Sequence, residues 1–593
     1  MFPRETGRYS DPRRPPRFLR GSYVFSKAWN AEKDLSDALA ELRRTAALRR
    51  SLGVTIAEPG TVLEPGRSAF VKAKTILARG SIFAALASNT PPLSERVRRD
   101  DGRVAAILGA IDALWGVLCV ADDPVYAPFK QEFPETLWED IFRWVDYLHP
   151  MHGRCEARDV CGINVVAGVN RAFEALSRLR VEGWHVALKI PVALPFLCDA
   201  WLNFDVYGTD EEDSLGMARV ARIVGAMNWL HHHLPEAGDV ARAAFTTNIR
   251  LLCRNDNSRL WRRVAKQIEY LTKLAPLQEF EYVWAGFFRI TAWLSGLTEL
   301  RVFRFSRATL ASVFAGVRHC LTRSEWHGAL EDASVLLYRM VALGDNNKTL
   351  MRALRMGLIA LLRDIWLADP NCDAQSLASH IAASARLPTV LRVICGGSRL
   401  EDGMDQAGET SDLPRQIANY EDLLLAICDA RDTARTVRQQ WKTIMTCTHR
   451  IGPHDSEVRA CSCGMAFYCS STCQRMSWPT HREECTRNDP WGTDGNLNLT
   501  DAVYLCTSAR LFINKHQDDI NAACRALATR AEPVMLATLT LNFTYDGLPP
   551  YELDIAKEQP PEEERVVYVW LKFLVGGQQY VRCLPWSISL PGP

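Results

Sequence analysis

The residues best suited to chemistry are nine cysteine and histidine side chains packed into one short stretch near the C-terminal end. They are Cys447, His449, His454, Cys461, Cys463, Cys469, Cys473, His481 and Cys485. Thiolate sulfur and imidazole nitrogen are the ligands that Zn²⁺ prefers, four to each tetrahedral structural site. A dense cysteine cluster in a reducing compartment indicates metal binding rather than disulfides. The stretch therefore predicts two zinc ions, with one candidate ligand left over.

The spacing within this stretch also predicts how the ligands are presented. Cys469 and Cys473 are four residues apart, as are His481 and Cys485. On a helix, residues four apart lie on the same face. Each pair can therefore ligate one metal ion.

The pattern Cys-x5-Cys-x3-Cys-Gln-x3-Trp-x2-His-x3-Cys, within residues 447–485, resembles the MYND-type zinc finger. The resemblance implies two zinc ions held in a cross-braced arrangement. One ion would be held by Cys461, Cys463, His481 and Cys485. The other would be held by Cys469 and Cys473 with Cys447 and one further ligand.

Two departures from the family pattern leave that further ligand open. The second ligand pair is one residue tighter than the usual Cys-x2-Cys, and Arg450 stands where the first pair would have its second cysteine. His449 or His454 can replace the missing cysteine. We prefer His449, because Cys447-x-His449 mirrors the tight second pair. A third alternative is a degenerate first site that holds no metal.

The resemblance also implies a function, because MYND fingers resemble peptide-binding modules for short Pro-containing motifs. The matching positions are Gln474 and Trp478, beside Phe467 and Tyr468. The alternative for Trp478 is that its ring only packs the small core of the finger. The layout of the whole chain is similar to that of MYND-finger proteins of mushroom-forming fungi.

The elements expected to carry the finger are mainly helical. Residues 23–445 show helical stripes of apolar side chains, as in Leu350, Leu354, Leu358, Leu361 and Ile365. A second stripe runs from Ile417 to Trp441. These residues predict a long helical body, either an irregular α-solenoid or a large bundle. The finger is expected at 446–486.

The two ends of the chain differ from this body. Residues 1–22 are rich in Arg and Pro and are expected to form a disordered basic arm. Residues 500–593 predict a small α+β tail. There, residues 537–545 alternate like a half-buried strand, and Gly576-Gly577 separates two strands of a hairpin. We expect an antiparallel sheet.

Composition excludes several classes of protein. Hydrophobic residues make up 47% and charged residues 23%, which are ordinary globular values and exclude wholesale disorder. The net charge of +1 provides no argument for a nucleic-acid binder. No secretory signal is visible, and Asp112 interrupts the apolar run Val104–Ala121, which favours a buried helix over a membrane span. We expect an intracellular protein, cytoplasmic or nuclear, with no membrane contact.

Other candidate metal ligands are weaker in pattern. His149, His152, Cys155 and Cys161 could form a further zinc site, although no family pattern supports it. The run His231–His233 could bind metal, but imidazoles near a helix C-terminus are also favoured by the helix dipole.

The sequence favours a non-enzymatic interaction protein, with no catalytic residues to name. It shows no phosphate-binding loop, nucleophile elbow or zincin motif. A SET-domain methyltransferase is disfavoured because no Asn-His-Ser-Cys-like motif is present. The alternatives are an enzyme with an unannounced site in the helical body, and a nucleic-acid-associated regulator that uses the basic arm with the finger.

Overall fold

The structure is a computed structural model, and its description covers most of the helical part of the chain. The described residues are 33–45, 64–78, 102–121, 135–148, isolated positions within 159–175, then 190–207, 214–274, 281–396, 418–449, 451, 454, 457–485, 491–493, 496–528, 536–543, 551–556 and 566–589, apart from a few positions inside these ranges. The basic arm predicted at 1–22 and the cluster His149, His152, Cys155 and Cys161 lie outside them.

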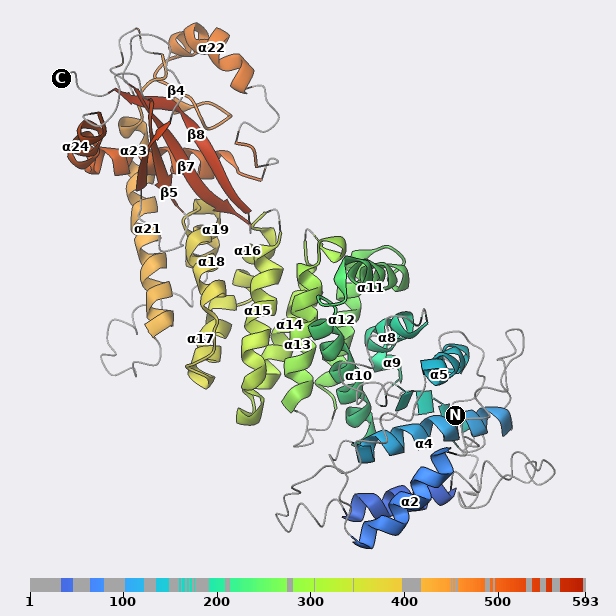
Figure 1. Cartoon of the computed structure of the whole chain (residues 1–593). Coiled ribbons are helices and arrows are strands. Elements are labelled where there is room, and N and C mark those ends of the chain that lie inside the picture. The colour runs from blue at the N-terminus through green and yellow to red at the C-terminus, as the bar shows by residue number, and fades with distance from the viewer. Residues whose placement is uncertain are drawn as a thin grey trace, which may run out of the picture. The chain divides into compact units, whose positions relative to one another are not determined.

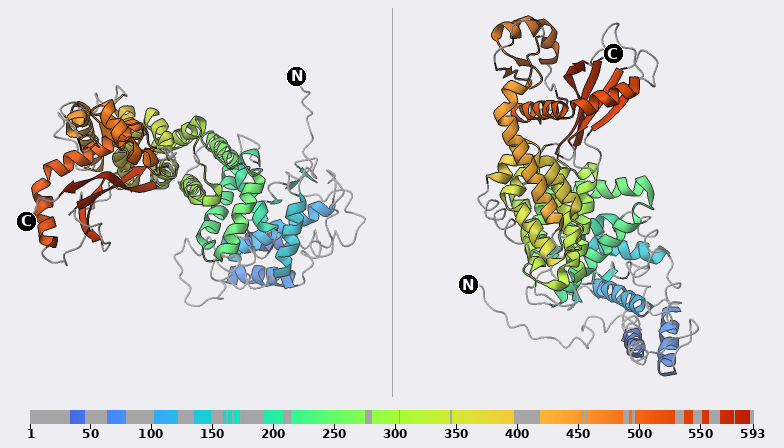
Figure 2. Two further views of the ribbon diagram at one scale, coloured as in Figure 1. Left: turned by 90° about the horizontal axis from the view of Figure 1, so that it is seen from above. Right: turned by 90° about the vertical axis from the view of Figure 1, so that its left-hand side faces the viewer.

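The chain divides into two compact units, Met1–Ile290 and Thr291–Pro593. Both are built mainly from helices, and the second also carries the finger and a sheet (Figures 1 and 2). The fold is therefore mainly α with a small C-terminal α+β part, as predicted from the sequence.

The described residues of the first unit form helices and one short strand pair. Its elements are residues 33–45, α2 (Glu64–Ala78), α4 (Gly102–Ala121), α5 (Glu135–Leu148), β1 (Asp159–Val160), β2 (Ile163–Asn164), α8 (Ala193–Leu202), α9 (Phe204–Tyr207), α10 (Ser214–His233), α11 (Gly238–Leu252), α12 (Asn257–Leu271) and α13 (Glu281–Gly296), which runs into the second unit.

Helix α4 is the apolar segment singled out in the sequence. By length and composition it could cross a membrane, yet 78% of its most apolar window is buried inside the structure. Asp112 forms an ion pair with Arg171. The Arg171 guanidinium also lies 5.0 Å from the ring centroid of Trp115. Burial and paired charge are the features of a helix inside a protein core.

The second unit begins with helices packed in sequence. They are η4 (Thr298–Leu300), α14 (Arg307–Leu321), η5 (Ser324–Trp326), α15 (Gly328–Ala342), α16 (Lys348–Arg355), α17 (Leu358–Ala368), α18 (Gln375–Ala385), α19 (Pro388–Cys395) and α21 (Ala418–Ile444). The stripe from Ile417 to Trp441 lies almost wholly on α21, and its apolar positions Leu424, Ile427 and Ala430 are buried.

One predicted stripe spans two helices rather than one. The chain breaks between α16 and α17 at Gly357, whose φ of 91° is left-handed. Only glycine adopts this conformation at low cost, so the helix cannot run through. Leu350 and Leu358 are both buried, so the stripe marked a common core and not a single helix.

The rest of the second unit holds the finger and the tail. Its elements are β3 (Arg459–Ala460), β4 (Phe467–Tyr468), α22 (Ser471–Cys485), α23 (Leu499–Lys515), α24 (Gln517–Ala528), β5 (Leu536–Asn542), β6 (Tyr551–Ala556), β7 (Val566–Val575) and β8 (Gln578–Ser589).

The sheet of the tail corrects the expectation of a purely antiparallel arrangement. Its strand order is β6-β5-β7-β8, and β5 pairs with β7 in parallel. The predicted hairpin of β7 and β8 is present, with its turn at Gly576. Alternation within β5 predicted a strand but carries no information about the direction of its partner.

Candidate metal centre

The chain enters the candidate metal centre from the end of α21. The Thr448 amide donates a hydrogen bond to the Phe467 carbonyl at 2.7 Å, and the Phe467 amide donates to the Thr448 hydroxyl at 2.9 Å. This double link places Cys447, the residue before Thr448, beside β4. Cys469 follows directly after β4, so the two cysteines are brought to the same place.

A tight turn between β3 and β4 carries the next two cysteines. The Cys461 amide donates to the Ala466 carbonyl at 2.8 Å, and the Gly464 amide donates to the Cys461 carbonyl at 2.9 Å. Gly464 has a left-handed φ of 73°, which lets the chain reverse direction within the turn. One turn therefore carries both Cys461 and Cys463, which belong to the same ligand group.

Helix α22 supplies ligands from its inner face. Cys473, Ser477 and His481 recur every four residues and are all buried. The Cys473 amide donates to the Ser470 hydroxyl at 3.1 Å, which caps the start of the helix. Because Cys473 and His481 are two turns apart, they serve different ligand groups.

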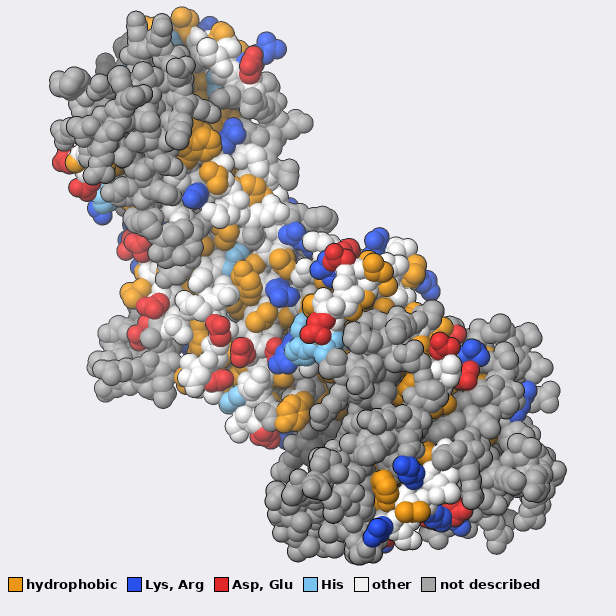
Figure 3. All heavy atoms as spheres, viewed as in Figure 1, with side chains coloured by type: hydrophobic (Ala, Val, Ile, Leu, Met, Phe, Trp, Pro, Cys, Tyr) orange, Lys and Arg blue, Asp and Glu red, His pale blue; other side chains and the backbone are white. Residues whose placement is uncertain are grey.

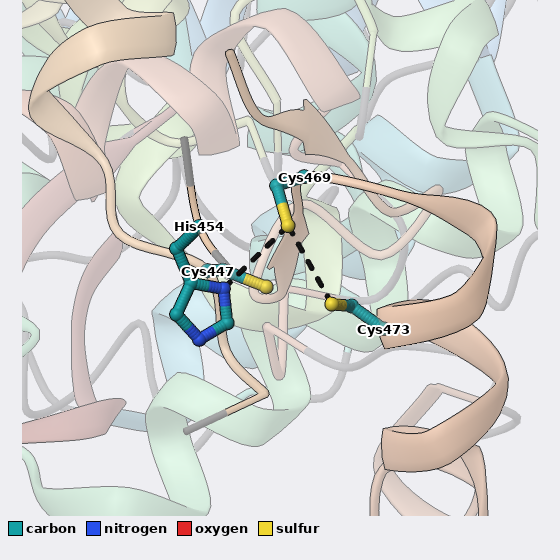
Figure 4. Close-up of side chains that lie close together, drawn as sticks. All are labelled: Cys447, His454, Cys469 and Cys473. Carbon is teal, nitrogen blue, oxygen red and sulfur yellow. Dashed lines mark hydrogen bonds between the residues drawn. The ribbon is translucent and has the colours of Figure 1, made fainter. Parts of the chain in front are cut away.

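One group consists of Cys447, His454, Cys469 and Cys473, whose ligand atoms all lie within 4.8 Å of one another. Figure 4 shows the four side chains converging on one point. Cys469 Sγ is 3.5 Å from Cys473 Sγ and 3.5 Å from His454 Nδ1. We call this the outer cluster, because only Cys473 is buried and His454 is exposed.

The other group consists of Cys461, Cys463, His481 and Cys485, again with all ligand atoms within 4.8 Å. Cys461 Sγ is 3.5 Å from Cys485 Sγ, and Cys463 Sγ is 3.3 Å from His481 Nε2. We call this the inner cluster, because three of its four members are buried. The two clusters interleave along the chain, which is the cross-braced order that the resemblance to the MYND finger implied.

Both clusters fit zinc. Metal–ligand bonds of about 2.0–2.3 Å in a tetrahedron place the ligand atoms about 3.3–3.8 Å apart. The four separations given above, 3.3–3.5 Å, fall in this range. Burial raises the pKa of the Cys463 thiol to about 12, so a thiolate at this position needs a cation beside it. All six cysteines are free of disulfides. Two Cys3His groups are therefore present, consistent with two zinc ions.

The structure corrects the preference for His449 as the fourth ligand of the outer cluster. His454 belongs to the group, and His449 does not. The backbone N–H of His449 forms a hydrogen bond with the Cys447 sulfur. The same kind of turn occurs at Cys463. There the amide of Met465, two residues later, donates to the Cys463 sulfur at 3.4 Å. The imidazole that completes the outer cluster is that of His454, seven residues after Cys447.

The predicted peptide-binding positions lie beside the metal ligands on α22. Gln474 is exposed, and Trp478, one turn later, is 38% exposed. The Trp478 ring centroid is 6.2 Å from that of His481, so the ring packs against a ligand of the inner cluster and is still partly exposed. The other predicted run, His231–His233, ends α10 and joins none of the ligand groups found among the described residues.

Sequence reasoning missed a set of residues that holds the inner cluster from outside the finger. The Trp491 indole N–H donates to the Cys463 carbonyl at 2.9 Å, and the Cys506 thiol lies 3.6 Å from the Gly464 carbonyl. A Cβ atom on Gly464 would lie 2.5 Å from the Cβ of Ala502 on α23. The only signal in the sequence was a tryptophan just after the last ligand.

The finger is thus seated on α23, which is itself anchored in the second unit. Asp501 is buried near the start of α23 and accepts hydrogen bonds from the Thr389 amide at 3.0 Å and the Thr389 hydroxyl at 2.6 Å. Asn498 caps the helix by accepting from the Asp501 amide. Helix α23 therefore links the inner cluster to α19.

Comparison with known proteins identifies the finger. Residues 445–485 match the family model of the MYND finger. No curated protein and no solved structure matches the chain. The chain therefore carries a MYND finger, which is a zinc-binding module of the kind that mediates protein–protein interactions.

Proposed function

We propose that this chain is a non-enzymatic, intracellular interaction protein whose MYND finger binds short Pro-containing peptide segments of a partner protein. The single observation that supports this most is the exposure of Trp478. A partly exposed aromatic ring on a helix fixed by metal ligands offers an apolar surface on which a proline ring can pack. A ring that only filled the finger core would be covered.

The zinc clusters support this role by fixing the helix that carries the ring. Cys473 and His481 tie α22 to both clusters, so the orientation of Trp478 is set before any peptide arrives. A preformed site loses less conformational entropy on binding than a flexible one. Gln474, one turn before Trp478, can exchange hydrogen bonds with the amide groups of an extended peptide.

The proposed intracellular setting follows from the thiol chemistry. The six cysteines of the finger ligate zinc as thiolates, and reducing conditions keep them from forming disulfides. We assign the chain no catalytic role.

The test is a pull-down of the full chain with immobilised Pro-rich peptides, comparing Trp478→Ala with Met476→Ala. Met476 is 64% exposed on the same helix but on a different face, so it is a matched control. We expect Trp478→Ala to weaken capture at least tenfold and Met476→Ala to leave it unchanged, both with two zinc ions retained. Equal capture by all three proteins would contradict the proposal.

A further inference from the structure

Helix α11 of the first unit has an outward face that is uncharged along its length. Val240, Ala244, Thr247 and Leu251 follow one another at steps of four, three and four residues, and all are exposed. Val240 is 84% exposed and Leu251 is 60% exposed. This spacing is typical of a helix face that packs against another helix.

The opposite face of α11 already has its own contacts. Its buried residues are Phe245, Thr246 and Ile249, and the helix packs on α8. Figure 1 shows α11 at the edge of the first unit, and Figure 3 shows hydrophobic side chains exposed over it, with charged ones beside them. The outward apolar stripe is therefore not needed to hold α11 in place.

Two opposite charges lie on one flank of this stripe, one near each end of the helix, and they indicate the kind of partner that the stripe binds. Asp239 lies at the N-terminal end with its side chain 90% exposed, and Arg250 lies three turns later on the same flank. Asp239 pairs with Arg242 at 2.6 Å. Arg250 is exposed, and within the described part of the chain it forms no ion pair.

We propose that the outward face of α11 is the contact between two copies of this chain, packed antiparallel about a two-fold axis. Such an axis reverses the helix direction but keeps each flank on its own side. Val240 then faces Leu251 of the second copy. Asp239 faces Arg250 of the second copy, and the same pair forms again at the other end. The face is therefore complementary to itself in charge.

The strength of this contact follows from its size. One face of a 15-residue helix provides less than the roughly 800 Å² per partner of a standard interface. The dimer should therefore be weak and should form as the protein concentration rises.

The test is sedimentation velocity of the full chain over a wide concentration range. We expect the 66.7 kDa monomer to shift towards a dimer as the concentration rises. Asp239→Arg or Arg250→Asp places like charges opposite each other twice in each dimer and should weaken association about tenfold. The double variant Asp239→Arg/Arg250→Asp restores opposite charges and should recover the wild-type dissociation constant.

Lys266→Asp on α12 is the matched control, because it makes the same kind of charge change at an exposed site away from the stripe. It should leave association unchanged. Val240→Glu removes the apolar contact and should abolish association, with the circular dichroism spectrum unaltered. A chain that stays monomeric at every concentration would overturn the proposal. So would single variants without effect, or a double variant no better than the single ones.

Discussion

At the scale of single residues, the two zinc clusters differ in how their ligands are supported. The outer cluster takes its histidine from a loop and has one exposed and two half-buried ligands. The inner cluster is mostly buried, and Trp491 fixes the backbone of Cys463 from outside the finger. Groups around a metal site that hold its ligands in place raise metal affinity. The two sites should therefore differ in both ligand identity and zinc release.

Ligand identity predicts different results for His449 and His454, the two candidates for the fourth ligand of the outer cluster. His454→Ala should lower the zinc content from two to about one ion per chain, because it removes a donor atom from the outer cluster. His449→Ala should retain two ions, because its imidazole is not among the ligand atoms of the outer cluster. Elemental analysis of the purified variants measures this directly. Loss of zinc from the His449 variant alone would show that His449, and not His454, is the fourth ligand of the outer cluster.

Zinc release predicts two phases on adding a chelator. The outer cluster should release its ion first, since chelator and water reach it more readily than the buried inner cluster. Trp491→Phe keeps an aromatic ring near Phe573 but removes the N–H donor to Cys463, so it should accelerate only the slow phase. Absorbance of a zinc-binding dye follows both phases. Simultaneous release of both ions from the wild-type chain would contradict this ranking.

At the scale of elements, the contact between the β3–β4 turn and α23 determines how firmly the finger is seated. Gly464 has almost no room, because an added Cβ would meet Ala502 at 2.5 Å. Gly492 has a similar left-handed φ of 67° but open space around it. These two glycines therefore separate the cost of backbone strain from the cost of steric overlap.

Substituting these glycines predicts unequal losses of stability. Gly492→Ala should cost only the left-handed conformation, about 1–2 kcal/mol. Gly464→Ala adds overpacking against α23 and should cost roughly 2–5 kcal/mol in total. Chemical denaturation followed by circular dichroism measures both. Similar losses for the two variants would mean that α23 moves aside without cost.

At the scale of the whole molecule, the finger belongs to the packing of the second unit rather than standing apart. It accepts a hydrogen bond from Trp491, lies against α23, and through α23 is linked to α19. About forty residues bury too little apolar surface to fold alone, so zinc supplies most of the finger's stability. Loss of zinc should therefore also destabilise the neighbouring helix α23.

Hydrogen exchange should show how far this effect extends. On adding a chelator, or in the His481→Ala variant, we expect faster exchange in residues 457–485 and also in α23. Helices α4 and α12 of the first unit have their own apolar cores and should keep their protection. Exchange limited to the finger would show a separable module, and loss of protection throughout the chain would show one cooperative core.

The sequence alone determined the ligand types and the mainly helical fold, and the cross-braced order of the clusters came from its resemblance to the MYND finger. Ligand types and helical stripes follow from chemistry and periodicity, which are local: Cys473 and Cys469 are four residues apart whatever surrounds them. The apolar stripe of α21 and the hairpin turn at Gly576 are local in the same sense.

Tertiary structure decided what depends on residues far apart in the chain. The structure places His454 rather than His449 in the outer cluster, and spacing along the chain could not decide between them. The parallel pairing of β5 with β7 and the break at Gly357 depended on partners and backbone angles that no periodicity encodes. The support of the inner cluster by Trp491 and α23 arises because Ala502 and Gly464, 38 residues apart, share one contact. Spacing along the chain reports which donors can share a metal, whereas only packing determines which of them do.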